Sequence, residues 1–401
     1  MFLSFALLFL VGLAAAAVCQ RLRLPRIIGM LLTGVLLGPY ALDLLDPLIL
    51  SISPELRKMA LVIILIKAGL SLDPADLKRV GRPALLLSFV PACFEIAAAV
   101  AFAPMLLGVT RVQAAVIGAV LGAVSPAVVV PKMVQLMEER RGTDKSIPQL
   151  ILAGASLDDV FVIVLFSAFV GMAQGSGAAA ADLAQIPVSI VLGILVGIAA
   201  GLVLAALFER AHRAQRSIRD SYKAILLLAA SFLMIALEDA LEGTVPVSGL
   251  LAVMSMACAV HLRCREKVGQ SLAGKFGKLW LGAETVLFVL VGAAVDIRAA
   301  AQEGAAAAVL ITAALAVRSL GVWLCLLGTE LNTKERLFCV IAYLPKATVQ
   351  AAIGGIPLAL GLARGGTVLS VAVLSILITA PLGAFGMDAT CRTLLHRENN
   401  T

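Results

Sequence analysis

The chain has 401 residues, of which 61% are hydrophobic and only 14% are charged, and its mean hydropathy is +1.03. A soluble protein of this length needs more charged surface, so the composition excludes a soluble domain and predicts an all-α polytopic membrane protein surrounded by lipid. The net charge of +7 does not indicate a nucleic-acid partner, because the basic residues lie in short loops between apolar segments, where they orient helices.

The first apolar segment opens the chain with MFLSFALLFLVGLAAAAVC. It has the apolar run of a signal peptide but lacks the basic residues with which such a peptide starts. We therefore interpret this segment as a retained first transmembrane helix.

Apolar stretches long enough to form spans follow one another to the end of the chain. We predict about 13 transmembrane helices. They cover residues 2–19, 27–40, 57–71, 84–106, 113–131, 148–173, 187–208, 221–238, 245–261, 279–296, 304–328, 336–355 and 367–388.

Basic residues set the expected orientation of these spans. Counted with the basic residues at the first positions of the spans that follow them, alternate loops and the C-terminal tail hold 24 of the Lys and Arg residues, whereas the other set of loops holds only 5. Positively charged loops stay in the cytoplasm. We therefore expect a cytoplasmic C-terminus and, with an odd number of spans, an N-terminus outside the cell inner (plasma) membrane.

An internal repeat is visible in two pairs of segments. LIKAGLSLDP at 65–74 is similar to FVLVGAAVDI at 288–297, and SPAVVV at 125–130 is similar to LPKATV at 344–349. The offsets are nearly equal, so six spans, one spacer span and six further spans form two repeats of opposite topology. Inverted repeats of this kind are typical of transporters, whose substrate site lies near the membrane midplane where the repeats meet.

Prolines interrupt two spans at positions that the repeat makes equivalent. Pro126 and Pro131 fall in the fifth span and Pro345 in the twelfth. Each proline removes a backbone donor and disfavours the preceding turn, so we predict two interrupted helices that cross near the midplane. Ser125 and Thr348 flank these breaks as candidate ion ligands, unless their hydroxyls simply bond the preceding helical turn.

Two adjacent carboxylates, Asp158 and Asp159, lie in the middle of the apolar sixth span. A charge at this depth is costly and therefore indicates function, although an acid pair that caps a helix end is the structural alternative. Neighbouring residues of a helix point about 100° apart, so only one of the two can face a small site fully. A carboxylate binds Na⁺ or Li⁺ when ionised and releases it when protonated, which suffices for exchange of a cation for a proton.

Three more charges near the middle of spans are candidates for the site. Glu95 and Arg318 are separated by 223 residues, which is the offset of the repeat, and we predict that they form a buried ion pair. The alternative is that Arg318 pairs with Asp158 and is displaced when a cation binds. Lys346 lies at the break in the twelfth span, where it can neutralise the carbonyl ends of the interrupted helices.

The sequence offers little for other classes of chemistry. The seven cysteines are scattered without metal-ligand spacing, and the three histidines lie at loops or termini. We find no nucleophile paired with a base and no phosphate-binding loop. We therefore expect neither an enzyme nor a resident cofactor.

Four stretches carry a resemblance to a known family: LVIILIKAGLSLDP, AVSPAVVVPKM, AGASLDDV and YLPKATVQAAIG. They resemble the cation/proton antiporter superfamily, and most closely a bacterial homologue of its NHA-type sodium/hydrogen exchanger branch. The similarity extends from about residue 24 to residue 390. It implies that Asp158 and Asp159 form the cation and proton site, and that Glu95, Arg318 and Lys346 are supporting charges.

The resemblance also implies a homodimer in which a core moves like an elevator against a dimerisation scaffold. Scaffold helices would occupy 1–83 and 221–303, and the ion-transporting core would occupy 84–174 and 304–390. The remaining parts are a linker helix with a cytoplasmic loop at 175–220 and a cytoplasmic tail at 391–401.

One position departs from part of the family. Members with a lysine in the eleventh span can use it as a proton carrier, but this sequence has Arg318 there. Because arginine is effectively always protonated, a second proton carried at this position is not expected.

Two alternative functions stay open at this point. A K⁺/H⁺ antiporter or a ligand-gated K⁺ efflux protein belongs to the same superfamily, although such proteins often carry a cytoplasmic nucleotide-binding domain, for which we expect no room after the last span. A sodium-coupled organic anion symporter also has broken crossing helices, but it would need more polar groups in the spans than this sequence has.

Overall fold

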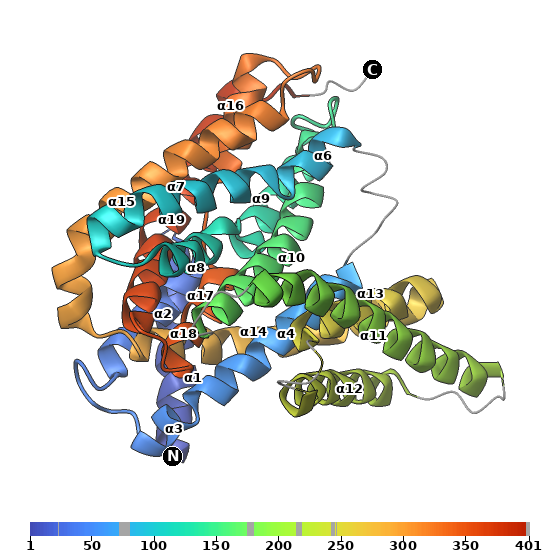
Figure 1. Cartoon of the computed structure of the whole chain (residues 1–401). Helices are drawn as coiled ribbons and strands as arrows, with labels where there is room; N and C mark the ends of the chain where they lie inside the picture. Colours follow the sequence, from blue (N-terminus) through green and yellow to red (C-terminus); the bar gives the residue numbers. More distant parts are fainter. Residues whose placement is uncertain are drawn as a thin grey trace. The chain divides into compact units, whose positions relative to one another are not determined.

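The computed structural model describes residues 1–22, 24–71, 81–174, 180–213, 219–241, 245 and 247–397, and in these residues the regular structure is helical apart from one isolated bridge between Arg141 and Arg397. The helices are α1 (Phe2–Arg21), α2 (Arg26–Leu37), α3 (Pro47–Ser51), α4 (Ser53–Ser71), α6 (Arg82–Leu87), α7 (Val90–Leu107), α8 (Arg111–Gly122), α9 (Pro126–Glu138), α10 (Ile147–Gln174), α11 (Ala180–Arg213), α12 (Asp220–Leu241), α13 (Gly249–Arg263), α14 (Glu266–Ala293), α15 (Ile297–Cys325), α16 (Thr333–Ala342), α17 (Thr348–Gly354), α18 (Ile356–Ala359) and α19 (Gly365–Leu394) (Figure 1).

The described residues contain nine helices that are long and apolar enough to cross a membrane, and three shorter apolar helices. Every predicted span overlaps a helix, and the chain is a multi-pass membrane protein. The three shorter apolar helices are α2, α13 and α17 with α18. They correspond to spans that are also short or interrupted in the sequence prediction. The exact number of thirteen spans therefore stays a prediction.

The helices form two compact units. Unit 1 comprises Met1–Pro54, Pro74–Ala173 and Leu287–Thr401, and unit 2 comprises Glu55–Asp73 and Gln174–Val286. These boundaries follow the packing within one chain. The division into a dimerisation scaffold and a moving core concerns motion and assembly, and it stays a prediction.

In unit 1, α7 packs closely against both α8 and α15 (Figure 1). Glycines make this possible, because a Cβ on Gly118 of α8 would lie 2.8 Å from the Cα of Ile96, and a Cβ on Gly321 of α15 would lie 3.1 Å from the ring of Phe94. Small residues let helix backbones approach in a membrane, where lipid does not drive helices together. The close approach brings the middle of α7 next to the middle of α15.

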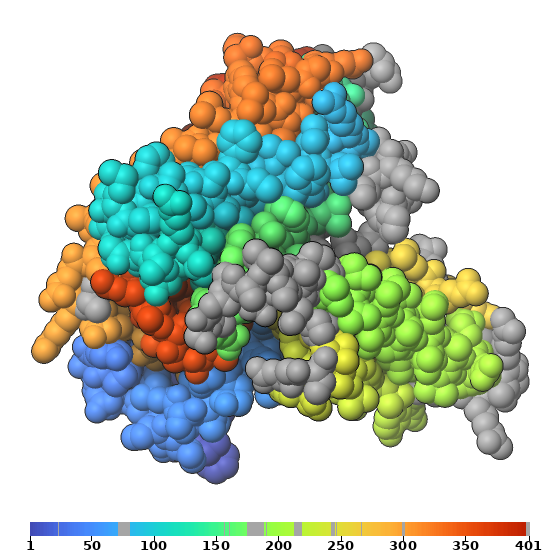
Figure 2. Space-filling model, viewed as in Figure 1, coloured from blue at the N-terminus to red at the C-terminus, as the bar shows by residue number. Residues whose placement is uncertain are grey.

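A buried apolar cluster joins α9, α10, α16 and α19 within unit 1. Met133, Ile151, Phe338 and Tyr343 are each at most 1% exposed in it. In the space-filling view, α6 and α7 (light blue to cyan) and α15 and α16 (orange) form the surface over this part of the unit (Figure 2). Large apolar side chains are exposed on α7 and α15, such as Met105, Leu320 and Leu324, as contact with lipid tails requires.

Unit 2 is built around the packing of α11 on α13. Gly193, Gly197 and Gly201 lie four residues apart on α11 and face the backbone of α13 along one stripe. A Cβ on Gly193 would lie 2.5 Å from the carbonyl oxygen of Ser248, so a larger residue cannot enter without moving the helices apart. This spacing is the small-residue motif of close helix pairs in membranes.

Candidate functional site

Two interrupted helices meet inside unit 1. Between α8 and α9 the chain is extended, with φ −84° and ψ 144° at Ala123 and φ −89° and ψ 113° at Ser125. A residue that precedes proline disfavours the helical conformation, which explains why the break lies directly before Pro126. The Ser125 amide donates a 2.8 Å hydrogen bond to the carbonyl oxygen of Pro345, so the first break contacts the second.

The second break separates α16 from α17 over residues 343–347, around Pro345. The structure thus has an interruption at Pro126 and at Pro345, as the sequence predicts. Pro131 is different, because α9 continues through it to Glu138. Pro131 falls within the helix, where it costs one helical hydrogen bond without ending the helix, and the prediction of a break there is wrong.

Arg318 lies on α15, is 1% exposed, and contacts the carbonyl ends of both half-helices. Its Nε donates to the carbonyl oxygen of Tyr343 at 3.1 Å, and its Nη1 donates to the carbonyl oxygen of Gly122. Gly122 ends α8, and Tyr343 is the C-cap of α16. Helix C-termini carry partial negative charge, so one guanidinium compensates both ends. The sequence predicts only Lys346 at these carbonyls, so the role of Arg318 at the helix ends is an addition that the structure makes.

The same guanidinium contacts two buried carboxylates. Its Nη1 donates to Oε2 of Glu95 at 2.8 Å, and its Nη2 donates to Oδ2 of Asp158 at 2.9 Å. The sequence left these two contacts as alternatives, but a planar fork of donors makes both at once. Arg318 therefore links α7, α10 and α15 in addition to the two breaks.

Lys346 lies in the second break and is fully buried. Its Nζ donates to Oε2 of Glu95 at 2.7 Å and approaches the carbonyl oxygen of Ala123 at 3.5 Å. Glu95 thus accepts from two cations through one oxygen, while its Oε1 has no hydrogen-bond partner in the described chain. The predicted contact of Lys346 with a helix-end carbonyl is present, but its shorter contact is with Glu95.

The two aspartates of α10 differ in their surroundings. Oδ2 of Asp158 accepts from Arg318 and, at 2.8 Å, from the amide of Val124 in the first break, so this side chain is held in place. Asp159 has 9% of its surface exposed, against 0% for Asp158. Oδ1 of each aspartate is buried and has no hydrogen-bond partner among the described residues. Asp159 is therefore the less constrained carboxylate.

Ser125 and Thr348 are buried next to the two breaks, at 0% and 1% exposure. Neither Oγ of Ser125 nor Oγ1 of Thr348 has a hydrogen-bond partner in the part of the chain that the structure describes. By contrast, the hydroxyl of Ser319 on α15 donates a 2.7 Å hydrogen bond to the carbonyl oxygen of Leu315 in the preceding helical turn. A hydroxyl left unpaired in an apolar interior is costly, so these two oxygens are available to a ligand.

Three further residues complete the crossing and were not singled out from the sequence. Gln350 bonds both breaks, Thr379 of α19 accepts from the amide of Lys346 at 2.9 Å, and the ring of Tyr343 lies 5.7 Å from the guanidinium carbon of Arg318. Tyr343 and Gln350 lie in the quoted stretch YLPKATVQAAIG. Their position as polar residues beside a predicted break could have identified them from the sequence. Thr379 had no such signal, because it comes from a distant helix.

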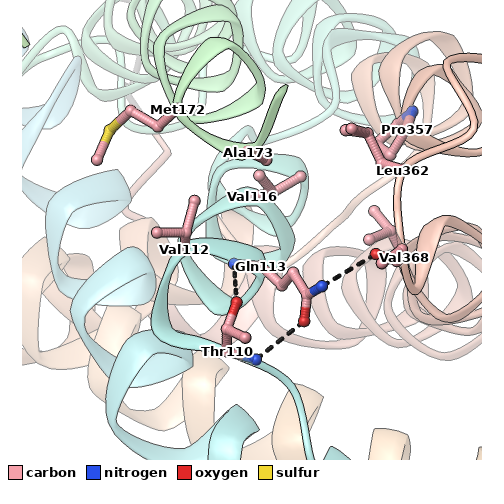
Figure 3. Close-up of a pocket in the computed structure, with 10 residues that line it drawn as sticks. Thr110, Val112, Gln113, Val116, Met172, Ala173, Pro357, Leu362 and Val368 are labelled. Atoms are coloured by element: carbon pink, nitrogen blue, oxygen red, sulfur yellow. Dashed lines mark hydrogen bonds between the residues drawn. The ribbon is translucent and has the colours of Figure 1, made fainter. Parts of the chain in front are cut away.

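A separate cavity of about 170 Å³ lies elsewhere in unit 1, and Figure 3 shows it between α8, α10 and the segment around α18. It is lined mainly by apolar side chains such as Val116, Met172 and Leu362. Its polar contacts are already paired, because Gln113 donates to the carbonyl oxygen of Ala363 at 3.1 Å and caps α8 with Thr110. No charged residue lines this cavity among the described residues, so it does not compete with the crossing as an ion site.

Comparison with known sequences shows which protein family the chain resembles. A family model described as "Sodium/hydrogen exchanger, transmembrane" matches residues 5–391. Sodium/hydrogen exchanger 9B2 of Xenopus tropicalis is 35% identical over 362 residues, which cover 87% of this chain and 65% of that protein. The 9B2 protein of Mus musculus is 34% identical over 375 residues, covering 90% and 66%. The chain therefore spans just under two thirds of the length of these relatives.

A solved structure has the same fold. The chain is similar to the sodium proton antiporter MjNhaP1 from Methanocaldococcus jannaschii at pH 8, with a TM-score of 0.81, 21% identity and coverage of 97% of each chain. At this identity the likeness establishes the antiporter fold and nothing more about the site.

Proposed function

Because the chain belongs to the transmembrane sodium/hydrogen exchanger family, we propose that it is a secondary active antiporter that exchanges Na⁺ or Li⁺ for protons. This family consists of exchangers rather than enzymes. The observation that carries the proposal is the set of unpaired buried oxygens at the crossing of two interrupted helices.

The charges of the cluster support this function. Three carboxylates, Glu95, Asp158 and Asp159, meet two cations, Arg318 and Lys346, in one buried site. When all five are ionised the cluster keeps one unbalanced negative charge, which is expensive in an apolar interior. One proton or one monovalent cation removes that charge, and the two therefore compete.

The oxygens divide into fixed and available ones. Oδ2 of Asp158 is held by Arg318 and the Val124 amide, so Asp159 is the principal carboxylate for cation and proton in this proposal. Oδ1 of Asp158 and the hydroxyls of Ser125 and Thr348 complete the ligands, since hard cations such as Na⁺ prefer oxygen. Glu95, Arg318 and Lys346 hold the two half-helix ends and supply fixed countercharge.

We extend the proposal to assembly and movement. The protein forms a homodimer in the cell inner (plasma) membrane, with the N-terminus outside and the C-terminus in the cytoplasm. The cluster moves with its helices in an elevator-type cycle that exposes Asp159 to each side in turn. The asymmetry of basic loops supports the orientation, and the resemblance to the NHA-type branch supports the dimer and the elevator.

Transport by purified protein in proteoliposomes with an internal pH-sensitive dye tests the function. We expect Na⁺ and Li⁺ to drive proton movement in the wild type, and we expect the Asp159→Asn variant to lose it, because an amide cannot exchange a cation for a proton. Glu303→Gln is the matched control, since Glu303 is an acid of α15 that pairs with Arg364 at 3.4 Å, fifteen residues from Arg318. Exchange at the wild-type rate in Asp159→Asn would overturn the site assignment.

The same assay separates the alternative functions. Proton movement driven by K⁺ but not by Na⁺ or Li⁺ would identify a K⁺/H⁺ antiporter instead. Sodium uptake that needs an organic anion and moves no proton would identify a sodium-coupled symporter.

A further inference from the structure

Gln350 is a buried polar side chain that contacts both breaks of the crossing. It lies on the first turn of α17, is 0% exposed, and comes two residues after Thr348. No role for it follows from the sequence, and its own hydrogen bonds are to backbone atoms rather than to the charged side chains of the cluster. A fully buried amide must pair its donor and acceptor, so its partners show what it holds together.

The two ends of the amide bond different segments. Oε1 of Gln350 accepts a 2.7 Å hydrogen bond from the backbone amide of Ala347, in the second break just before α17 begins. This bond pairs an amide that would otherwise lack a helical partner. Its Nε2 donates at 2.8 Å to the carbonyl oxygen of Ala123, where α8 ends in the first break. One side chain therefore spans the distance between the two extended segments.

The bridge is placed where it sets the position of the available oxygens. Ala123 lies two residues from Ser125, and Gln350 lies two residues from Thr348, so each end of the bridge is next to one unpaired hydroxyl. Two more links join the breaks, the 2.8 Å backbone bond from Ser125 to Pro345 and the longer approach of Lys346 Nζ to the Ala123 carbonyl oxygen at 3.5 Å. Aligning Pro126 with Pro345 places Pro131 opposite Gln350, and a proline side chain cannot form such a bridge.

We propose that Gln350 is a positioning residue that determines which cation the crossing accepts, by fixing the spacing between the Ser125 and Thr348 hydroxyls. The inference rests on the proposed exchange function. Selectivity among hard cations depends on cavity size and on how rigidly the oxygens are held. Without the bridge the spacing of the two breaks is held less rigidly, although Arg318 and the Ser125–Pro345 bond still join them, and a looser site favours the larger cation.

The test compares two variants with a matched control. Gln350→Met keeps the length of the side chain but removes both hydrogen bonds, and Gln350→Asn keeps the amide but is one methylene too short to reach both breaks. Thr379→Val is the control, because it removes the 2.9 Å bond to the Lys346 amide, a buried bond to the second break that does not cross to the first. Folding is checked by size-exclusion profile and thermal stability in detergent.

The measurements are the apparent KM values for Li⁺, Na⁺ and K⁺ in proteoliposomes, and the stabilisation that each cation gives against heat in detergent. We expect the Li⁺-to-Na⁺ ratio of KM to rise by about fivefold in Gln350→Met, an amount typical of the loss of one to two hydrogen bonds. We expect a smaller rise of the Li⁺-to-Na⁺ ratio of KM in Gln350→Asn. If the Met variant does not fold, the Asn variant alone tests the proposal. Thr379→Val loses thermal stability but keeps the wild-type ratio.

The outcomes separate this inference from the function on which it rests. A wild-type cation ratio in a folded Gln350 variant would overturn the positioning role and leave the exchange function standing, as would an equal change of ratio in Thr379→Val. If the wild type neither exchanges nor is stabilised by any of the three cations, the proposed function fails and this inference fails with it.

Discussion

At the scale of single residues, the site depends on Arg318 having more partners than an ion pair needs. A simple Glu95–Arg318 pair would tolerate exchange of the two residues. In the structure Arg318 also bonds Asp158 and two helix-end carbonyls, those of Gly122 and Tyr343. A carboxylate at position 318 would therefore face another carboxylate and two carbonyl oxygens.

This arrangement gives a prediction about stability. Glu95→Gln takes from Lys346 the carboxylate that it contacts at 2.7 Å, and removal of one partner of a buried ion pair should destabilise the protein by about 3–5 kcal/mol. The double variant Glu95→Arg with Arg318→Glu should not recover the loss, because it reverses the charge facing the helix ends. Thermal unfolding in detergent measures both, with Glu303→Gln as the control, because Glu303 is a partly buried acid of α15 that pairs with Arg364 outside the cluster. Recovery in the double variant would show that the carbonyl contacts of Arg318 carry little of its role.

At the scale of helices, the sequence predicts the breaks well and the partners of each break poorly. Proline marks an interruption locally, so Pro126 and Pro345 were sufficient to locate both breaks. Pro131 was misleading because a proline inside a helix and a proline at its start look alike in sequence. The choice between Glu95 and Asp158 as the partner of Arg318 needed the packing of α7, α10 and α15, which a repeat offset does not determine.

The helix pair of unit 2 gives a prediction at the same scale. Gly197→Leu should disrupt the packing of α11 on α13, because a Cβ there would meet Ala252 and Ser255, and overpacking of this kind costs about 1–3 kcal/mol or more. Gly277→Leu on α14 is the matched control, since nothing lies within 4 Å of a Cβ at that glycine. Melting temperature and the folded fraction after extraction report the difference. Leu favours the helix more than Gly does, so an equal loss in both variants would mean that the loss does not come from the stripe of glycines.

At the scale of the whole molecule, composition was enough for the membrane class, and the four quoted stretches were enough for the antiporter fold, while the inverted repeat stays a prediction. The number of spans was less secure, because α2 and α13 are shorter than a typical crossing and α16 with α17 share one span. A repeat also cannot state how many charges move per cycle. That number follows from which groups of the finished cluster are free to exchange a proton.

The charge balance predicts an electroneutral exchange of one proton for one cation. Arg318 is effectively always protonated, Lys346 is paired with Glu95 at 2.7 Å, and Asp158 is held by two donors, which leaves Asp159 as the single exchanging group. The loaded cluster then carries the same charge with Na⁺ as with H⁺. An imposed membrane potential acts on a net moved charge with about 2.3 kcal/mol per 100 mV, so the rate of an electrogenic exchanger would change markedly. We expect the exchange rate in proteoliposomes to be the same with and without a K⁺ diffusion potential set by valinomycin. A rate that rises with the potential would require a second proton, and Lys346→Gln would then identify whether Lys346 carries it.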